Sequence, residues 1–385
     1  MMYLAIRWSL IFNSFYVFLL LVRQILQIDT ISMALAFSQL QLLILILLGA
    51  KSLRLQLLEL IMLASICISL LLSDFGLYSL NNIMVDFLKP ILFIMAVASI
   101  RSVKIYEIVE DLRVERILNL YALTTIVSVC IGLYYYYFVD LIYPAYSSIY
   151  SLMGYFCIVK RSRTRSYGFL IVLLLSGKRA VMLSGLIAHV LFGGLLNNKK
   201  HVFIIILTTA SLVLMSISIF DLNIIFRNVL KQDLAQLSEL SSVIDVLVQV
   251  SGGRIDELID GLNYEFNFEN ILFGKSLGYT YESFSFDEKE HKNFHFTPAS
   301  LFVSYGICFT AMFLYYAVNI IFNSKIKLIS EKYGNIYAIR MYMISSLFFF
   351  LTEYGVFGYI NFCIGLGMLA GLKLMRAEMM DPTEH

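Results

Sequence analysis

Apolar runs of close to 20 residues recur along almost the whole chain, and they restrict the possible folds more than any other feature. A helix of about 20 apolar residues crosses a hydrocarbon core of roughly 30 Å, because each residue adds about 1.5 Å. Charged residues make up only 15% of the chain and hydrophobic residues 59%. A soluble globular protein usually has about 25% charged residues. The pattern therefore predicts an all-α polytopic membrane protein.

About twelve transmembrane helices are expected, and one pair of them is short and broken. The run 167–177 would rise only about 16 Å as a helix, which is too short to cross alone. We therefore expect a break at Ser176–Arg179 and a return helix after it. Broken backbone at membrane depth needs cover from protein or a water-filled cavity, so Lys178 and Arg179 should lie recessed. The expected spans are 8–26, 31–50, 57–73, 83–100, 117–139, 141–159, 167–177, 180–196, 202–220, 297–322, 335–352 and 358–375.

The distribution of Lys and Arg between the loops predicts the orientation. With a cytoplasmic N-terminus, the cytoplasmic segments hold 18 basic residues and the short external loops hold three, namely Arg23, Lys178 and Arg179. Cytoplasmic loops of membrane proteins carry the excess of Lys and Arg. Both termini are therefore expected in the cytoplasm. A single long helix over 167–196 would place seven of these basic residues outside, so the bias argues against it.

One long polar segment divides the chain into three parts. Residues 1–220 would form transmembrane helices 1–9, residues 221–296 a large external loop, and residues 297–385 helices 10–12 with a cytoplasmic tail. The loop carries 13 Asp and Glu against 6 Lys and Arg. Within it, leucines and isoleucines recur at steps of three and four over 230–247 and again over 255–262, which predicts two amphipathic helices.

Gly253 and Arg254 precede the second of these helices. Free backbone N–H groups at a helix start favour an anion, so this position could bind a phosphate. The alternative is that Arg254 pairs with Asp256 or Glu257. Farther up the chain, Asp86 and Lys89 lie three residues apart and share a helix face. They would either neutralise each other or line a polar pocket.

Composition and motifs exclude several classes of function. The net charge of +2 gives no support for nucleic-acid binding. All five cysteines lie in apolar runs, so neither a disulfide framework nor a Cys-based zinc site is expected in the loop. The loop has no Asp-x-Asp pair for a cation, and no Gly-Lys-Ser/Thr loop follows a predicted strand. We therefore expect no metal and no cofactor.

Three features resemble the bacterial O-antigen polymerase (Wzy-type) and ligase superfamily. The first is Ser176-Gly177-Lys178-Arg179 between two short helices. The second is Gly252-Gly253-Arg254, followed some twenty residues later by Leu272-Phe273-Gly274-Lys275-Ser276-Leu277-Gly278 in the large loop. The third is His295 with Gly306 eleven positions later. Phe296 stands after this histidine, where the family commonly has Asn, Ser or Gln.

The resemblance implies a GT-C-like membrane glycosyltransferase in the bacterial inner membrane, with its active site facing the periplasm. Its donor would be an oligosaccharide linked to polyprenyl diphosphate, and its other partners membrane lipids and a chain-length regulator protein. The diphosphate would bind Arg179 and Arg254, because guanidinium groups make forked contacts with phosphates. His295 would orient or deprotonate the acceptor hydroxyl. Candidate substrate-binding residues beside these are Lys178, Gly253, Lys275 and Glu353.

Other functions remain possible at this point. A ligase would transfer the finished glycan to lipid A–core instead of to the next repeat unit. A flippase or transporter would also have about twelve spans, but it usually has two comparable halves, and none are visible between 1–196 and 202–385. A non-catalytic scaffold would not need recessed arginines.

Overall fold

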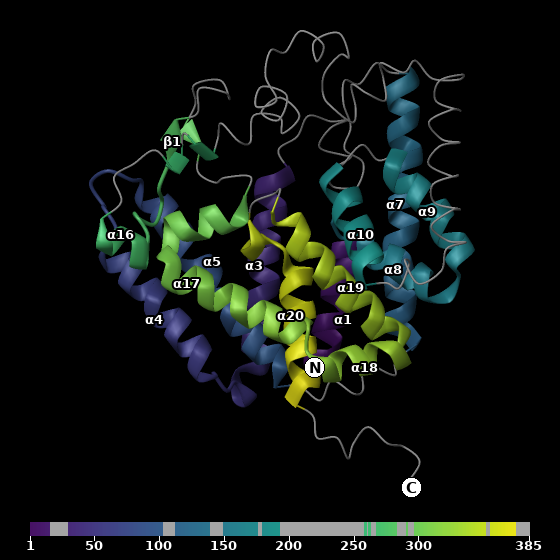
Figure 1. Cartoon of the computed structure of the whole chain (residues 1–385), viewed down its shortest axis with the longest axis horizontal. Helices are drawn as coiled ribbons and strands as arrows, with labels where there is room; N and C mark the ends of the chain where they lie inside the picture. Colours follow the sequence, from purple (N-terminus) through teal and green to yellow (C-terminus); the bar gives the residue numbers. More distant parts are fainter. Residues whose placement is uncertain are drawn as a thin grey trace, which may run out of the picture.

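The chain folds as an α-helical membrane protein (Figure 1). The computed structural model describes residues 1–15, 30–102, 112–138, 149–175, 179–192, 258–259, 261–262, 267–282, 290–291, 296–351 and 355–374. Within these residues, Leu80–Arg101, Arg113–Tyr135 and Thr297–Ile321 are long and apolar enough to cross a membrane. Shorter apolar helices cover Ala36–Ser52, Leu57–Leu71, Ala180–Phe192 and Ile360–Leu374.

Most of the predicted spans in the described residues coincide with helices. The first half of the chain contains α1 (Met2–Ser14), α3 (Thr30–Gly49), α4 (Leu57–Leu71), α5 (Leu80–Arg101), α7 (Leu112–Phe138), α8 (Ser151–Arg161), α9 (Arg163–Leu175) and α10 (Arg179–Phe192), with the 3₁₀ turn η1 (Ala50–Ser52). The second half contains α16 (Phe268–Phe273), α17 (Thr297–Ile321), α18 (Ser324–Lys332), α19 (Gly334–Phe349) and α20 (Ile360–Leu374), with the 3₁₀ turn η3 (Val356–Gly358). The short strands β1 (Tyr281–Glu282) and β2 (Glu290–His291) pair antiparallel.

Two predicted spans differ from the helices of the structure. The span 8–26 begins earlier, because α1 starts at Met2. Arg7 lies half-buried within α1, and the helix extends to both sides of it, because the apolar stem of an arginine can pack along a helix. Within the span 141–159, residues 149–150 form a turn and α8 begins at Ser151.

Two separate helices occupy the region of the expected short pair. Helix α9 ends at Leu175 and packs against α7 and α8, whereas α10 begins at Arg179 and packs against α19. The ring of Phe192, at the end of α10, lies 5.2 Å from the ring of Phe322, which follows α17. Helices α10 and α17 therefore end together. With 14 residues, α10 rises about 21 Å.

An aromatic cluster forms the core between α5, α17, α20 and η3. The ring of Phe93 lies 5.4 Å from that of Phe357 and 6.1 Å from that of Phe362. Phe313 of α17 lies 5.3 Å from Phe357. Fully buried aromatic side chains remove large apolar areas and make ring contacts that fix their neighbours. This cluster holds α5 and α17 together beneath the site described below.

A chain of buried amides joins α1, α7 and α20. Asn13 Nδ2 donates to Asn361 Oδ1 at 2.8 Å, and Asn361 Nδ2 donates to the Tyr121 hydroxyl at 2.8 Å. That hydroxyl in turn donates to the Leu10 carbonyl at 2.6 Å. Polar side chains inside a membrane bundle associate helices through such interhelical hydrogen bonds.

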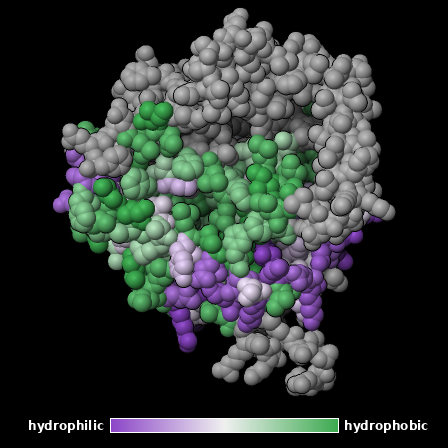
Figure 2. Space-filling view, in the orientation of Figure 1, coloured by the Kyte–Doolittle hydropathy of each residue, from purple (hydrophilic) through white to green (hydrophobic). Residues whose placement is uncertain are grey.

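The ends of several helices gather at one polar margin of the molecule. Lys160 Nζ of α8 donates to the Glu331 carbonyl of α18 at 2.8 Å, and Lys373 Nζ of α20 donates to Asn319 Oδ1 of α17 at 3.1 Å. Figure 2 shows this margin below an apolar band on the described part of the face in view. The margin is called the basic end below, because α18 also exposes Lys327 and Lys332 there.

Candidate functional site

The helix α17 is broken at Gly306, and the segment 272–275 fills the break. Gly306 has φ 74° and ψ 178°, a conformation that side-chain-bearing residues rarely adopt. A Cβ at this position would lie 2.2 Å from the Leu272 carbonyl oxygen. A Cβ on Gly274, which has φ 88°, would lie 2.6 Å from the Ser304 carbonyl carbon. Two glycines therefore permit direct backbone contact between the loop and the helix.

The loop and α17 itself both supply hydrogen bonds to the backbone around the break. The Lys275 N–H donates to the Val303 carbonyl at 2.7 Å, and the Thr310 hydroxyl donates to the Gly306 carbonyl at 2.8 Å. Non-helical backbone within a membrane protein survives where other groups of the protein replace its missing hydrogen bonds. Hydrogen bonds within the protein therefore stabilise the broken backbone at Gly306.

Hydroxyls from α4 and its following turn hold the same loop. Ser69 Oγ donates to the Phe273 carbonyl at 2.6 Å. The Leu277 N–H donates to Ser73 Oγ at 3.0 Å, and the Asp74 N–H donates to Ser276 Oγ at 3.2 Å. The segment 272–278 is thus bonded to α4 on one side and to α17 on the other. We call this segment the clasped loop.

Asp86 of α5 forms the last anchor of the clasped loop. Its Oδ2 accepts the Gly278 N–H at 2.9 Å, and its own carbonyl accepts the Tyr305 hydroxyl at 2.7 Å. Gly278 lies 192 residues away in sequence. The two interpretations of Asp86 with Lys89 therefore both missed a main role of this carboxylate, which is to bind loop backbone.

Lys275 is the predicted substrate-binding residue whose side chain the structure describes. It is half-buried, and its Nζ lies 4.7 Å from the centroid of the Tyr279 ring, a distance typical of a cation–π contact. Burial lowers the pKa of Lys275. Burial and the neighbouring Tyr78 raise the pKa of Tyr279 to about 12, so this phenol stays protonated near neutral pH. The lysine is held on an aromatic face beside the break in α17.

For the other predicted site residues, the structure describes a helix position or the neighbouring chain, and several of them lie outside the described residues. Arg179 is the first residue of α10. Because α10 and α17 end together at the basic end, both helices start toward the opposite side. The Thr297 N–H, two residues after His295, donates to the Phe350 carbonyl at 2.9 Å, three residues before Glu353. The predicted site residues outside the described ranges are Lys178, Gly253, Arg254, His295 and Glu353.

No protein-family model, curated protein or solved structure matches this chain. The fold brings together the described parts of two sequence motifs, because the Leu272–Gly278 segment lies directly on Gly306. The chain that follows His295 thus leads into the helix on which Lys275 is anchored.

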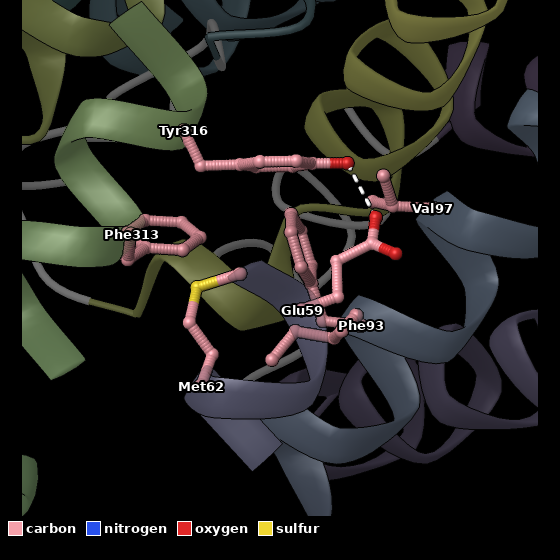
Figure 3. A pocket seen from close by; sticks show the side chains of 7 residues that line it. Glu59, Met62, Phe93, Val97, Phe313 and Tyr316 are labelled. Atoms are coloured by element: carbon pink, nitrogen blue, oxygen red, sulfur yellow. Dashed lines mark hydrogen bonds between the residues drawn. The ribbon is translucent and has the colours of Figure 1, made fainter. Parts of the chain in front are cut away.

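A second polar cluster lies near the basic end of α4, α5 and α17 and does not have the character of a substrate site. Glu59 forms an ion pair with Arg101, and the Tyr316 hydroxyl donates to Glu59 Oε1 at 2.6 Å (Figure 3). Arg101 also donates to the Arg54 carbonyl. The adjoining cavity has a volume of about 10 Å³ and is otherwise lined by apolar and aromatic side chains. Such a volume holds about one water molecule, so the cluster is a structural connection between helices.

Sequence analysis missed the serines that hold the clasped loop, although a signal was available. Ser65, Ser69 and Ser73 repeat every four residues in an otherwise apolar run, which puts them on one helix face. A polar stripe on a membrane helix faces protein and not lipid. Nothing in the spacing indicated that its partner would be a loop some 200 residues later.

Proposed function

We propose that this protein is a membrane glycan polymerase. It would transfer a growing oligosaccharide from polyprenyl diphosphate to the next lipid-linked repeat unit. The observation that carries the proposal is the docking of the clasped loop on the break at Gly306. It joins the segment after Gly253-Arg254 to the helix after His295, the two loop motifs on which the family resemblance rests.

The proposed chemistry needs cations on one side and a proton acceptor on the other. The acceptor hydroxyl oxygen attacks the anomeric carbon of the donor, the bond to the diphosphate oxygen breaks, and the hydroxyl proton passes to His295. Arg179 and Arg254 stabilise the negative charge that develops on the diphosphate, since fixed cations aimed at such charge lower the barrier most. Lys275 adds a third positive group at the same side.

The full architecture of twelve spans and a GT-C-like arrangement belongs to this proposal. The basic end would face the cytoplasm, by the excess of Lys and Arg in cytoplasmic loops. The clasped loop and the start of α10 would then face the periplasm. Since α10 rises about 21 Å from the basic end, less than the roughly 30 Å core, Arg179 would lie below the outer surface.

Topology gives the first test. In a cysteine-free background, single cysteines at Lys199, Lys325 and Tyr264 are treated with a membrane-impermeant maleimide on intact spheroplasts. We expect labelling at position 264 and protection at 199 and 325 until the membrane is permeabilised. Labelling of position 325 from outside would contradict the twelve-span topology.

A deletion strain tests the function itself. Surface glycans from this strain, separated by electrophoresis, should carry a single repeat unit on lipid A–core, and plasmid-borne wild-type protein should restore the ladder of longer chains. A ligase deletion would instead leave the core bare while lipid-linked polymer accumulates. An unchanged ladder would refute both activities.

A further inference from the structure

We propose that Asp86 is a positioning residue that fixes Lys275 at the substrate side of the site, an inference that rests on the proposed transferase function. Asp86 is buried within an apolar helix, where a carboxylate is costly unless its oxygens are bonded. The hydrogen bonds of Asp86 join two segments of the chain. One is the clasped loop through Gly278, and the other is α17 through Tyr305, the residue just before the break.

The sequence of α5 explains why the carbonyl of Asp86 is available for one contact while its side chain makes the other. Pro90 lies four residues later within the helix. Proline has no N–H, so the carbonyl of Asp86 lacks its usual helical donor. The Tyr305 hydroxyl supplies a donor to that carbonyl at 2.7 Å, while the side chain accepts the Gly278 N–H. A single residue thus ties α5 to the loop with its side chain and to α17 with its main chain.

The anchors on both sides of Lys275 limit where its ammonium group can lie. Its own N–H is bound to Val303, and Gly278, three residues later, is bound to Asp86. Its Nζ rests on Tyr279, the residue directly after Gly278. Release of Gly278 would therefore move the ring that supports the ammonium group. A preorganised cation binds an anionic substrate better, because less conformational freedom is lost on binding.

The first measurement needs no enzymatic activity. Lys275→Cys is placed in a cysteine-free background, and its reaction rate with a membrane-impermeant maleimide is measured. We expect Asp86→Ala to raise this rate about 10-fold, because the loss of one buried hydrogen bond shifts the equilibrium between anchored and released loop by roughly 10-fold. Asp86→Asn should stay within about 2-fold, since its amide oxygen still accepts the Gly278 N–H. If Asp86→Ala does not accumulate in membranes, Asp86→Ser is measured in its place.

A matched control removes a carboxylate from the neighbouring helix α16. Glu269 is exposed and lies six residues before Lys275. Glu269→Ala should leave the labelling rate within about 2-fold of the parent, because a substitution at an exposed position away from buried contacts changes stability little. An equal rise in both alanine variants, or no rise in Asp86→Ala, would overturn the positioning role.

Kinetics with Lys275 in place then connect the anchor to transfer. With purified protein and a polyprenyl-diphosphate-linked repeat unit, Asp86→Ala should raise KM about 10-fold with little change in kcat, and Asp86→Asn should restore KM. A purely structural role would lower the yield of folded protein and leave KM unchanged. If labelling responds as expected but the wild-type protein has no transferase activity, the proposed function fails while the anchoring of the loop stands.

Discussion

Arg101→Met should lower the free energy of unfolding by about 3–5 kcal/mol, because it leaves the Glu59 carboxylate buried without its cation. Glu59 and Arg101 side chains are 1% and 4% exposed, so bulk water does not solvate the charge that loses its partner. Glu59→Met should cost a similar amount by leaving the guanidinium group unpaired. Unfolding of the purified protein in detergent micelles, followed by circular dichroism, measures both changes.

The double variant separates the ion pair from the packing around it. In Glu59→Met/Arg101→Met no uncompensated charge remains, so the loss should be far smaller than the sum of the single losses. Some loss should persist, because the Tyr316 hydroxyl and the Gln56 N–H also donate to Glu59. Additive single effects would show that the two residues do not form one buried unit.

The chain offers a matched surface pair as a control. Arg161 forms an ion pair with Glu115, with side chains 47% and 29% exposed. Arg161→Met should change the free energy of unfolding by at most about 1 kcal/mol, since exposed pairs are screened by water and salt. The contrast between the two arginines would assign the expected loss in Arg101→Met to burial and not to the removal of an arginine as such.

The membrane class and most helix positions could be predicted because one strong signal, apolar length, determines both. α3, α4, α5, α17, α19 and α20 all lie within a few residues of predicted spans. The errors occurred where a local feature competed with that signal. Arg7 lies inside α1, although the predicted span began only after this charged residue, and residues 149–150 form a turn within the predicted span 141–159, where Ser147, Ser148 and Ser151 interrupt the apolar run.

The site was less predictable, because its contacts join residues distant in sequence. The resemblance selected Lys275 and Gly306, and both lie at the junction of loop and helix. Their actual contacts, Lys275 with Val303 and Gly306 with Leu272, depend on a backbone break that periodicity cannot indicate. The sequence singled out Asp86 only together with Lys89, and a carboxylate can pair with a side chain, a ligand or a backbone N–H, which composition does not distinguish.

The two arginines and the histidine of the proposed mechanism should respond differently to substitution. If Arg254 and Arg179 hold the diphosphate through forked contacts, Arg→Lys keeps the charge and loses one hydrogen bond. A charge-assisted hydrogen bond contributes on the order of 1.5–3 kcal/mol, and about 1.4 kcal/mol corresponds to tenfold in rate. Arg254→Lys and Arg179→Lys should therefore lower turnover roughly 10- to 100-fold, and the alanine variants should lose more.

His295→Ala should block transfer and leave donor binding nearly intact, because His295 is assigned to the acceptor hydroxyl and not to the diphosphate. The measurement pairs equilibrium binding of the polyprenyl-diphosphate-linked donor with turnover for each variant, at equal membrane expression. His189→Ala is a poor control because His189 is buried against Tyr155, so the control is His201→Ala, between the expected spans 180–196 and 202–220 on the expected cytoplasmic side. Full turnover in Arg254→Ala would remove the arginine from the diphosphate site. Loss of donor binding in His295→Ala but not in Arg254→Ala would reverse the two roles, since only a group that contacts the donor can lower its affinity without any acceptor present.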